Sequence, residues 1–113
     1  MSPGLTPRRG EIWWVALDPA LGSEIAKTRP CLVLTRNVVN EHRRTVVVIP
    51  LSSSPSAHPP IRVAVRCAGK PAVAMVDQIR AISKQRLRTL IDVAGEQDLA
   101  AIARALRQIL DLP

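Results

Sequence analysis

The residues best suited to chemistry lie in a polar loop between two apolar runs. The loop, residues 22–30, follows the apolar residues 12–17 and precedes the apolar residues 31–34. Loops held on a rigid scaffold carry a large share of functional side chains. At the basic end of this loop, the planar guanidinium of Arg29 can hold two phosphate oxygens and stays charged. Arg29 is therefore the first candidate for an anion-binding residue; the alternative is an ordinary surface arginine before a strand.

The charge of the chain also indicates an anionic partner. Its 113 residues include 16 basic and 9 acidic side chains, a net charge of +7, and 13 of the basic residues are arginine. Arginine suits bidentate phosphate contacts and stacking on bases. This balance favours nucleic acid as the partner, although a genome of high GC content would also raise the share of arginine.

Cysteine and histidine are not spaced as metal ligands. Cys31 and Cys67 each lie in or beside an apolar run, no CxxC is present, and His42 and His58 are not at ligand spacing from either cysteine. We expect two buried free thiols, because cysteine packs as a small apolar residue. No metal and no other cofactor is expected.

The length fits one domain. Residues 1–8 contain two prolines and a glycine without periodicity, so they are expected to form a flexible leader before a single domain at residues 9–113. No apolar run reaches the ~20 residues of a membrane helix. The N-terminus lacks the apolar segment of a signal peptide, and the expected location is the cytoplasm.

Six apolar segments predict strands, at residues 11–17, 30–35, 45–51, 61–66, 72–82 and 89–93. The first has little polar alternation, which indicates a strand covered on both faces. The fourth alternates apolar with basic residues, which indicates a half-buried strand with a basic outer face. Residues 37–44 are expected to be a polar connection. Pro50 predicts an edge position or a bulge, and Ser83 is placed to cap a short helical turn.

A C-terminal helix is the clearest helical signal. Leu99, Ile102, Leu106, Ile109 and Leu110 recur at the 3.6-residue period and predict one buried face. This face is expected to cover the open side of the sheet. The order of elements indicates an α+β fold or small barrel, with a curved sheet of five to seven mostly antiparallel strands.

Several blocks of the sequence together resemble the MazF/PemK/Kid-type toxins of bacterial toxin–antitoxin systems. The blocks are residues 9–13, 17–19, 22–24, 27–30, 48–53, 76–80 and 110–112, in the right order and spacing. The resemblance implies a small SH3-like β-barrel of the CcdB/MazF kind with a C-terminal helix, usually a homodimer. It also implies an acidic antitoxin as partner, which agrees with the basic charge of the chain.

The activity implied by the resemblance is ribosome-independent cleavage of single-stranded mRNA at short sequences. In the family, the ribose 2′-hydroxyl attacks the neighbouring phosphate without a metal. The products are a 2′,3′-cyclic phosphate and a 5′-hydroxyl.

The resemblance also assigns residues. Arg29 matches the family's catalytic arginine, and Ser52 stands where many members have a catalytic threonine, so the hydroxyl donor is kept. Glu24 matches an acidic residue of the loop that closes over substrate or is displaced by antitoxin. Asp77 matches an aspartate that some members use as the base, but the arginine that those members place two residues earlier is Met75 here.

The general base stays open among Asp77, Glu24 and His58. A guanidinium is almost always protonated at neutral pH and is therefore a poor base, so Arg29 is expected to stabilise charge instead. The residues expected to bind RNA are Lys27, Thr28, Ser53, Gln78, Arg80 and Arg86. Strand alternation predicts that Trp13 and Trp14 are one core and one partly exposed residue.

Two other functions are consistent with the same fold. One is a gyrase-poisoning toxin of the CcdB kind, but such toxins rely on a tryptophan near the C-terminus, where this chain has residues 111–113, Asp-Leu-Pro. The other is a non-catalytic RNA-binding module, in which Arg29 contributes affinity alone.

Overall fold

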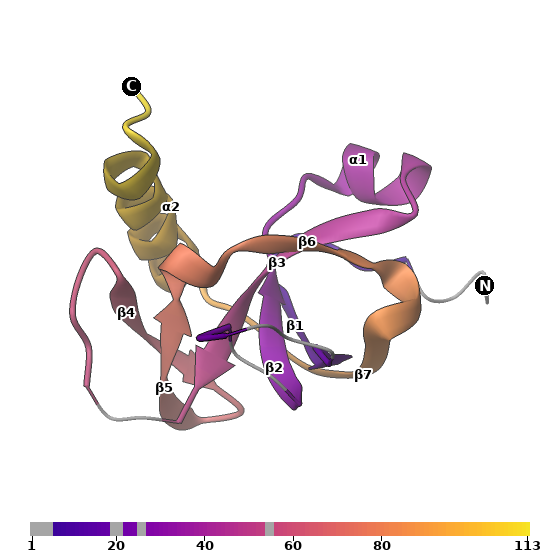
Figure 1. Ribbon diagram of the computed structural model, residues 1–113, viewed down its shortest axis with the longest axis horizontal. Helices are drawn as coiled ribbons and strands as arrows, with labels where there is room; N and C mark the ends of the chain where they lie inside the picture. The colour runs from indigo at the N-terminus through magenta and orange to yellow at the C-terminus, as the bar shows by residue number, and fades with distance from the viewer. Residues whose placement is uncertain (1–5, 19–21, 25–26, 54–55) are drawn as a thin grey trace.

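The structure, a computed structural model, describes residues 6–18, 22–24, 27–53 and 56–113. Within these ranges, seven strands curl around one another and a helix closes one side (Figure 1). The strands are β1 (Glu11–Ala16), β2 (Thr28–Val33), β3 (Thr45–Ser52), β4 (Arg62–Cys67), β5 (Lys70–Met75), β6 (Arg80–Ser83) and β7 (Leu87–Val93). The helices are α1 (Asn37–His42), α2 (Glu96–Leu110) and two 3-10 turns, η2 (Val76–Gln78) and η3 (Lys84–Arg86).

The strands form one sheet in the order β4-β5-β3-β2-β1-β7, and β6 also pairs with β3. Every pairing between these strands is antiparallel. The predicted α+β class, with a small curled barrel and a C-terminal helix, is therefore confirmed.

The central strands separate two apolar cores, because side chains alternate between the faces of a strand. On one face, Ile12, Leu32 and Ile49 join an outer core that β4, β5 and α2 cover. On the other face, Val15 and Cys31 belong to an inner core completed by Trp13, Leu17, Val33, Val46, Val48, Ile82 and Leu87. This confirms that the first strand is covered on both faces.

Pro50 is not at an edge or a bulge, as predicted, but in the central strand β3. The β6 pairing of β3 ends at Val48, and its β5 pairing begins at Leu51. Proline lacks the N–H that a ladder needs, and it stands where β3 exchanges one neighbour for the other. The sequence does not show that β3 changes its pairing partner here, and for this reason the position of Pro50 was predicted wrongly.

Three further predictions are wrong in detail. Residues 37–44 contain the helix α1 instead of a plain connection. The predicted strand at 72–82 is broken by η2 into β5 and β6. On α2, Ile102 is fully buried, but Leu110 is 50% exposed because it lies in the last turn of the helix.

The ends of the domain are held by specific contacts. Gly10 has φ of +93°, and a Cβ there would come 3.3 Å from Leu99 Cδ1, so glycine allows α2 to pack against the start of β1. Of the predicted flexible leader, residues 1–5 lie outside the described residues. Within it, Pro7 is buried and the Arg8 N–H donates to Glu11 Oε1 at 2.7 Å.

Candidate functional site

Arg29, Ser52 and Arg80 lie on the inner-core face of the sheet. The β1–β2 register pairs Arg29 with Val15, an inner-core residue. The β3–β6 register likewise pairs Arg80 with Val48, another inner-core residue. Residues paired across strands project to the same face. Ser52 follows Val48 by four residues in β3, so its side chain projects to this face as well.

The strand register brings Arg29 and Ser52 together. β2 and β3 pair Val33 with Val48 and Cys31 with Pro50, and the same register continued by two residues sets Arg29 opposite Ser52. Both residues also line one pocket. The two residues implied by the family resemblance as catalytic, 23 positions apart in the chain, are thus neighbours in the fold.

The thiol of Cys31 lies beneath this face. Burial raises the pKa of Cys31 to about 12, and the guanidinium of Arg80 acts in the opposite direction by favouring the thiolate. Arg80 is therefore close to Cys31, two residues from Arg29. The inner-core face of the sheet therefore carries two guanidinium groups, those of Arg29 and Arg80, above the buried, protonated thiol of Cys31.

The base of the loop before Arg29 is held by a clamp of hydrogen bonds. The Lys27 N–H donates to Asp18 Oδ1 at 2.8 Å, and the Leu17 N–H donates to the Lys27 carbonyl at 2.9 Å. Arg86 Nη1 donates to the carbonyls of Ala16 at 3.0 Å and Asp18 at 2.6 Å. These contacts fix the chain where it enters β2, two residues before Arg29.

Lys27 itself has φ of +70°, a left-handed conformation that is unfavourable for lysine. The clamp is what holds it there. Residues 25 and 26 of the predicted loop lie outside the described residues. The part of this loop that the resemblance implies closes over substrate, residues 24–28, is therefore described only at Glu24, Lys27 and Thr28, and Thr28 begins β2.

Nearly all of the predicted site residues line one of two pockets. The first, the Trp14 pocket, has a volume of about 500 Å³ and is lined by Trp14, Cys67 and residues 27–30, 51–53 and 70–72. It contains Lys27, Thr28, Arg29, Ser52 and Ser53. The second, the Asp77 pocket, has a volume of about 400 Å³ and is lined by residues 23–24 and 77–80, which include Glu24, Gln78 and Arg80.

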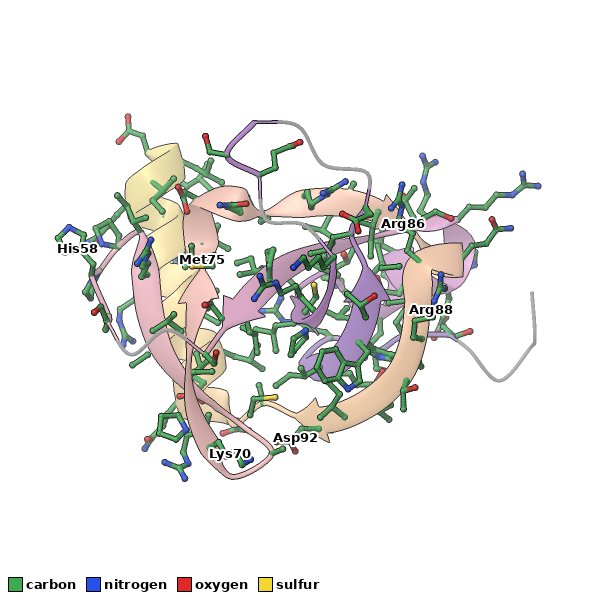
Figure 2. The ribbon with its side chains drawn as sticks, turned by 60° about the horizontal axis from the view of Figure 1, so that its bottom comes forward. His58, Lys70, Met75, Arg86, Arg88 and Asp92 are labelled. Atoms are coloured by element: carbon green, nitrogen blue, oxygen red, sulfur yellow. The ribbon has the colours of Figure 1, made fainter. Side chains whose placement is uncertain are left out.

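His58 and Arg86 lie elsewhere. Figure 2 shows His58 at one margin of the molecule, on the loop before β4, and Arg86 toward the opposite side, where η3 meets β7. His58 lines neither pocket. Arg86 is engaged with the backbone of the loop base, so its position in this structure is that of a positioning residue. A third pocket, of about 620 Å³ between residues 41–44 and 83–85, contains none of the predicted site residues.

Sequence reasoning missed the roles of Asp18 and Lys70. No role for Asp18 is predicted from the sequence, although an aspartate before proline often caps a loop through its carboxylate. Lys70 lines the Trp14 pocket from β5.

The prediction for the tryptophans is confirmed, since Trp13 is 6% exposed and Trp14 41% exposed. Of the two free cysteines, Cys31 is buried as expected, but Cys67 is only half-buried because it borders the pocket.

Among the described residues, no group of three or more His, Cys, Asp or Glu side chains could hold a metal ion. Within the same part of the chain, no helix is long and apolar enough to cross a membrane.

The family model for PemK-like, MazF-like toxins of type II toxin–antitoxin systems matches residues 8–110. The chain belongs to this family. MazF9, an endoribonuclease of Mycobacterium tuberculosis, is 34% identical over 93% of this chain and 97% of its own length. EndoA, an endoribonuclease of Bacillus subtilis, is 28% identical over 93% of this chain and 95% of its own length. The predicted family and the predicted enzyme class, endoribonuclease, are confirmed.

Solved structures of the family share the fold. The M. tuberculosis toxin MazF-mt6 is 27% identical, with a TM-score of 0.75 over 91% of this chain and 98% of that chain. MazF of Deinococcus radiodurans has a TM-score of 0.83 at 24% identity, over 94% and 97% of the two chains. An endoribonuclease of a mycobacterial species, solved in complex with its cognate antitoxin, has a TM-score of 0.79 at 23% identity, over 95% and 97%.

Proposed function

We propose that this toxin cuts single-stranded mRNA at short sequences by attack of a ribose 2′-hydroxyl on the adjacent phosphate. The products are a 2′,3′-cyclic phosphate and a 5′-hydroxyl, and no metal takes part. The observation that carries the proposal is the juxtaposition of Arg29 and Ser52 across β2 and β3, on a face that also holds Arg80. A guanidinium and a hydroxyl beside one another are donors suited to a phosphorane, which carries its charge on oxygen.

Arg29 stabilises the charge of the transition state. Its fork can donate to two phosphate oxygens at once. A guanidinium is a poor base because it holds its proton at neutral pH. A second cation nearby, Arg80, helps to balance the two negative charges of the phosphorane. Proton donation from Arg29 to the leaving 5′-oxygen is compatible with this arrangement.

Ser52 donates a hydrogen bond to a non-bridging phosphate oxygen. It ends β3, where Val73 of β5 pairs with it, so the hydroxyl is carried on a strand of the sheet. A hydroxyl held on a strand keeps its direction when the substrate arrives, and such fixed donors stabilise charge without reorganisation.

The base is Asp77 or Glu24. Both carboxylates border the Asp77 pocket, whose lining also includes Arg80 of the inner face. His58 lines neither pocket, which leaves the two carboxylates as the better supported candidates. Arg80 links the carboxylates to the phosphate site, since it borders their pocket and faces the inner core beside Cys31.

The partners we propose are mRNA, a cognate acidic antitoxin and a second copy of the chain. The mycobacterial relative in complex with its antitoxin supports the antitoxin. The net charge of +7 favours acidic partners of both kinds. Because mRNA is the substrate, the location we propose is the cytoplasm.

The test is cleavage of a long single-stranded RNA in EDTA, followed by mapping of both new ends. Wild-type protein should give discrete cuts with cyclic-phosphate and 5′-hydroxyl ends. Arg29→Ala should reduce the rate by about 10²–10³-fold, the usual cost of a lost transition-state donor, and Ser52→Ala by a smaller factor. Ser52→Thr, which restores the residue found in many members, should remain active.

Two results would overturn the proposal. RNA that stays intact while DNA gyrase religation is slowed would favour the gyrase-poisoning alternative. RNA that is bound but not cut would leave a non-catalytic RNA-binding module.

A further inference from the structure

The Trp14 pocket has an apolar floor beside the residues that would hold the phosphate. Trp14, Pro30 and Pro71 contribute rings, and Leu51 and Ala72 contribute aliphatic carbon. Arg29 and Ser52 line the same pocket. The side chains of Arg29 and Ser52 project to the inner-core face and that of Trp14 to the outer-core face, but the pocket lies where β2 begins and β3 ends, and residues of both faces line it there. An apolar surface that meets a phosphate site at the strand ends has the composition needed for a nucleotide, whose base is flat and apolar on its faces and whose backbone is charged.

Trp14 is the largest exposed apolar side chain among the described residues. Trp13 is 6% exposed, whereas its neighbour Trp14 is 41% exposed. Trp14 faces the outer-core side with Ile12, but it lies beyond the end of that core. Its side chain is therefore partly exposed and lines the pocket.

We propose that the Trp14 pocket receives the nucleobase next to the scissile phosphate, with the base stacked on the Trp14 indole. This inference rests on the proposed function and adds a residue that determines affinity and sequence preference. Single-stranded RNA is commonly recognised by bases splayed onto aromatic side chains, and every base has a face that can stack on an indole.

The charges on the rim fit the flanking phosphates. Lys27 and Lys70 both line the pocket, one just before β2 and the other at the start of β5, and the described residues of its lining include no carboxylate. This distribution favours an RNA segment over an acidic peptide carrying an aromatic anchor, because the pocket provides serine and threonine hydroxyls as well as cations for a phosphodiester backbone.

The wall that carries Lys70 is held in place from outside the pocket. The tip of the β4–β5 hairpin is Ala68-Gly69, and the Ala68 N–H donates to Asp92 Oδ2 at 2.8 Å. Figure 2 shows Lys70 and Asp92 near each other at the same end of the molecule. The pocket is therefore preformed on one side, which lowers the entropic cost of binding.

The test uses the intrinsic fluorescence of the protein. Short single-stranded oligoribonucleotides of each base composition are titrated into wild type and Trp14→Phe, and the difference in emission reports on Trp14. Stacking predicts quenching of the wild-type signal that saturates, with a different midpoint for different bases. This arm does not require cleavage, so it can succeed or fail independently of the proposed function.

Steady-state cleavage then separates binding from chemistry. Trp14→Ala should raise KM by about 5- to 150-fold, from the ~1–3 kcal/mol that a base–aromatic stack contributes, with a smaller change in kcat. Trp14→Phe should stay within a few-fold of wild type because it keeps an aromatic face. Leu90→Ala, which truncates another exposed apolar residue on β7, is the matched control and should leave KM unchanged.

Three outcomes would overturn the inference. The first is an unchanged KM in a folded Trp14→Ala protein that cuts RNA. The second is the absence of quenching by any oligoribonucleotide that binds. The third is quenching by an antitoxin peptide but by no RNA, which would assign the pocket to the protein partner. If wild type cuts no RNA but its Trp14 is still quenched, the proposed function fails and the pocket assignment stands.

Discussion

Arg86 is expected to act by positioning the loop base instead of contacting RNA, and the change Arg86→Gln distinguishes the two roles. The Arg86 guanidinium donates through Nη1 to the carbonyls of Ala16 and Asp18, at 3.0 and 2.6 Å. Those residues end β1 and open the loop that leads to Arg29. Removing the guanidinium frees the loop base from η3 while leaving Arg29 itself intact.

The size of the effect follows from these two bonds. A hydrogen bond contributes ~0.5–1.5 kcal/mol net, and the Asp18 carbonyl is exposed, so water can replace part of the loss. We expect the free energy of unfolding to fall by about 1–2 kcal/mol. A displacement of ~1 Å at a catalytic group can cost ~10²-fold in rate, so kcat should fall by about 10- to 100-fold.

The assay combines urea unfolding with RNA cleavage at several salt concentrations. Arg88→Gln is the matched control, because it removes the same charge two residues away. Within the described part of the chain, Arg88 Nη1 donates to carbonyls of its own segment, those of Gln85 at 2.7 Å and Leu87 at 3.4 Å. Figure 2 shows both arginines on the η3–β7 side of the molecule. Arg88→Gln should leave kcat close to wild type.

A direct phosphate contact by Arg86 would give a different result. Each phosphate neutralised on a single strand contributes ~0.7 to the slope of log affinity against log salt. If Arg86→Gln lowers this slope by about 0.7 relative to Arg88→Gln, with unchanged kcat and stability, the positioning role is refuted.

Three other predictions concern the elements around the site. Ala68→Asn should raise the free energy of unfolding, measured in urea titrations, by up to about 1 kcal/mol. The reason is that Ala68 and Gly69 have φ of +51° and +77°, and asparagine tolerates such a left-handed turn better than alanine. A loss of stability would contradict this. Hydrogen bonds from the backbone N–H groups of Ala68 and Val93 hold the pKa of Asp92 below its usual value. The stability that the Asp92 carboxylate contributes is therefore fully present above the unfolded-state pKa of ~3.9 and is lost as pH falls through the lower folded-state pKa. The difference in free energy of unfolding between wild type and Asp92→Asn should shrink at acidic pH. A difference that does not change with pH would refute this. Burial raises the pKa of both thiols, that of Cys31 to about 12, and Asp92 also raises the pKa of Cys67, so access to the reagent decides which thiol reacts. A thiol reagent should modify native protein at Cys67, half-buried in the Trp14 pocket, and reach the fully buried Cys31 only on unfolding; rapid modification of Cys31 in the native state would oppose this.

Much of the fold follows from local pattern. The apolar runs predict the strands, and the apolar period from Leu99 to Ile109 predicts α2. Local pattern failed where a contact distant in sequence decides the structure. Pro50 is central because β3 changes partners beside it. The 3-10 turn η2 breaks the predicted strand at Asp77 and Gln78, and the polarity of two residues alone does not distinguish a break from a continuing strand. The short helix α1 was missed because Val38 and Val39 are exposed and give no buried period.

The candidate site was predicted residue by residue through the family resemblance, whereas its arrangement required the sheet register. Alternation alone indicates that one tryptophan is exposed, but not which one, because both faces of β1 are covered. The fold decides in favour of Trp14, which projects past the end of the outer core. The hydrogen bonds of Arg86 span 68 and 70 residues of sequence, and no local signal identifies them.

The central claim is that the ribose 2′-hydroxyl is the nucleophile and that Arg29 and Ser52 donate hydrogen bonds to the phosphate that it attacks. The most direct measurement is single-turnover cleavage, in EDTA, of an oligoribonucleotide with one 2′-deoxyribose at the nucleotide 5′ to the mapped cut. The account predicts that this substrate binds as tightly as the all-ribose oligomer and is not cut. Cleavage of the deoxy-substituted bond at the wild-type rate would contradict the account, because water or another nucleophile would then carry out the attack.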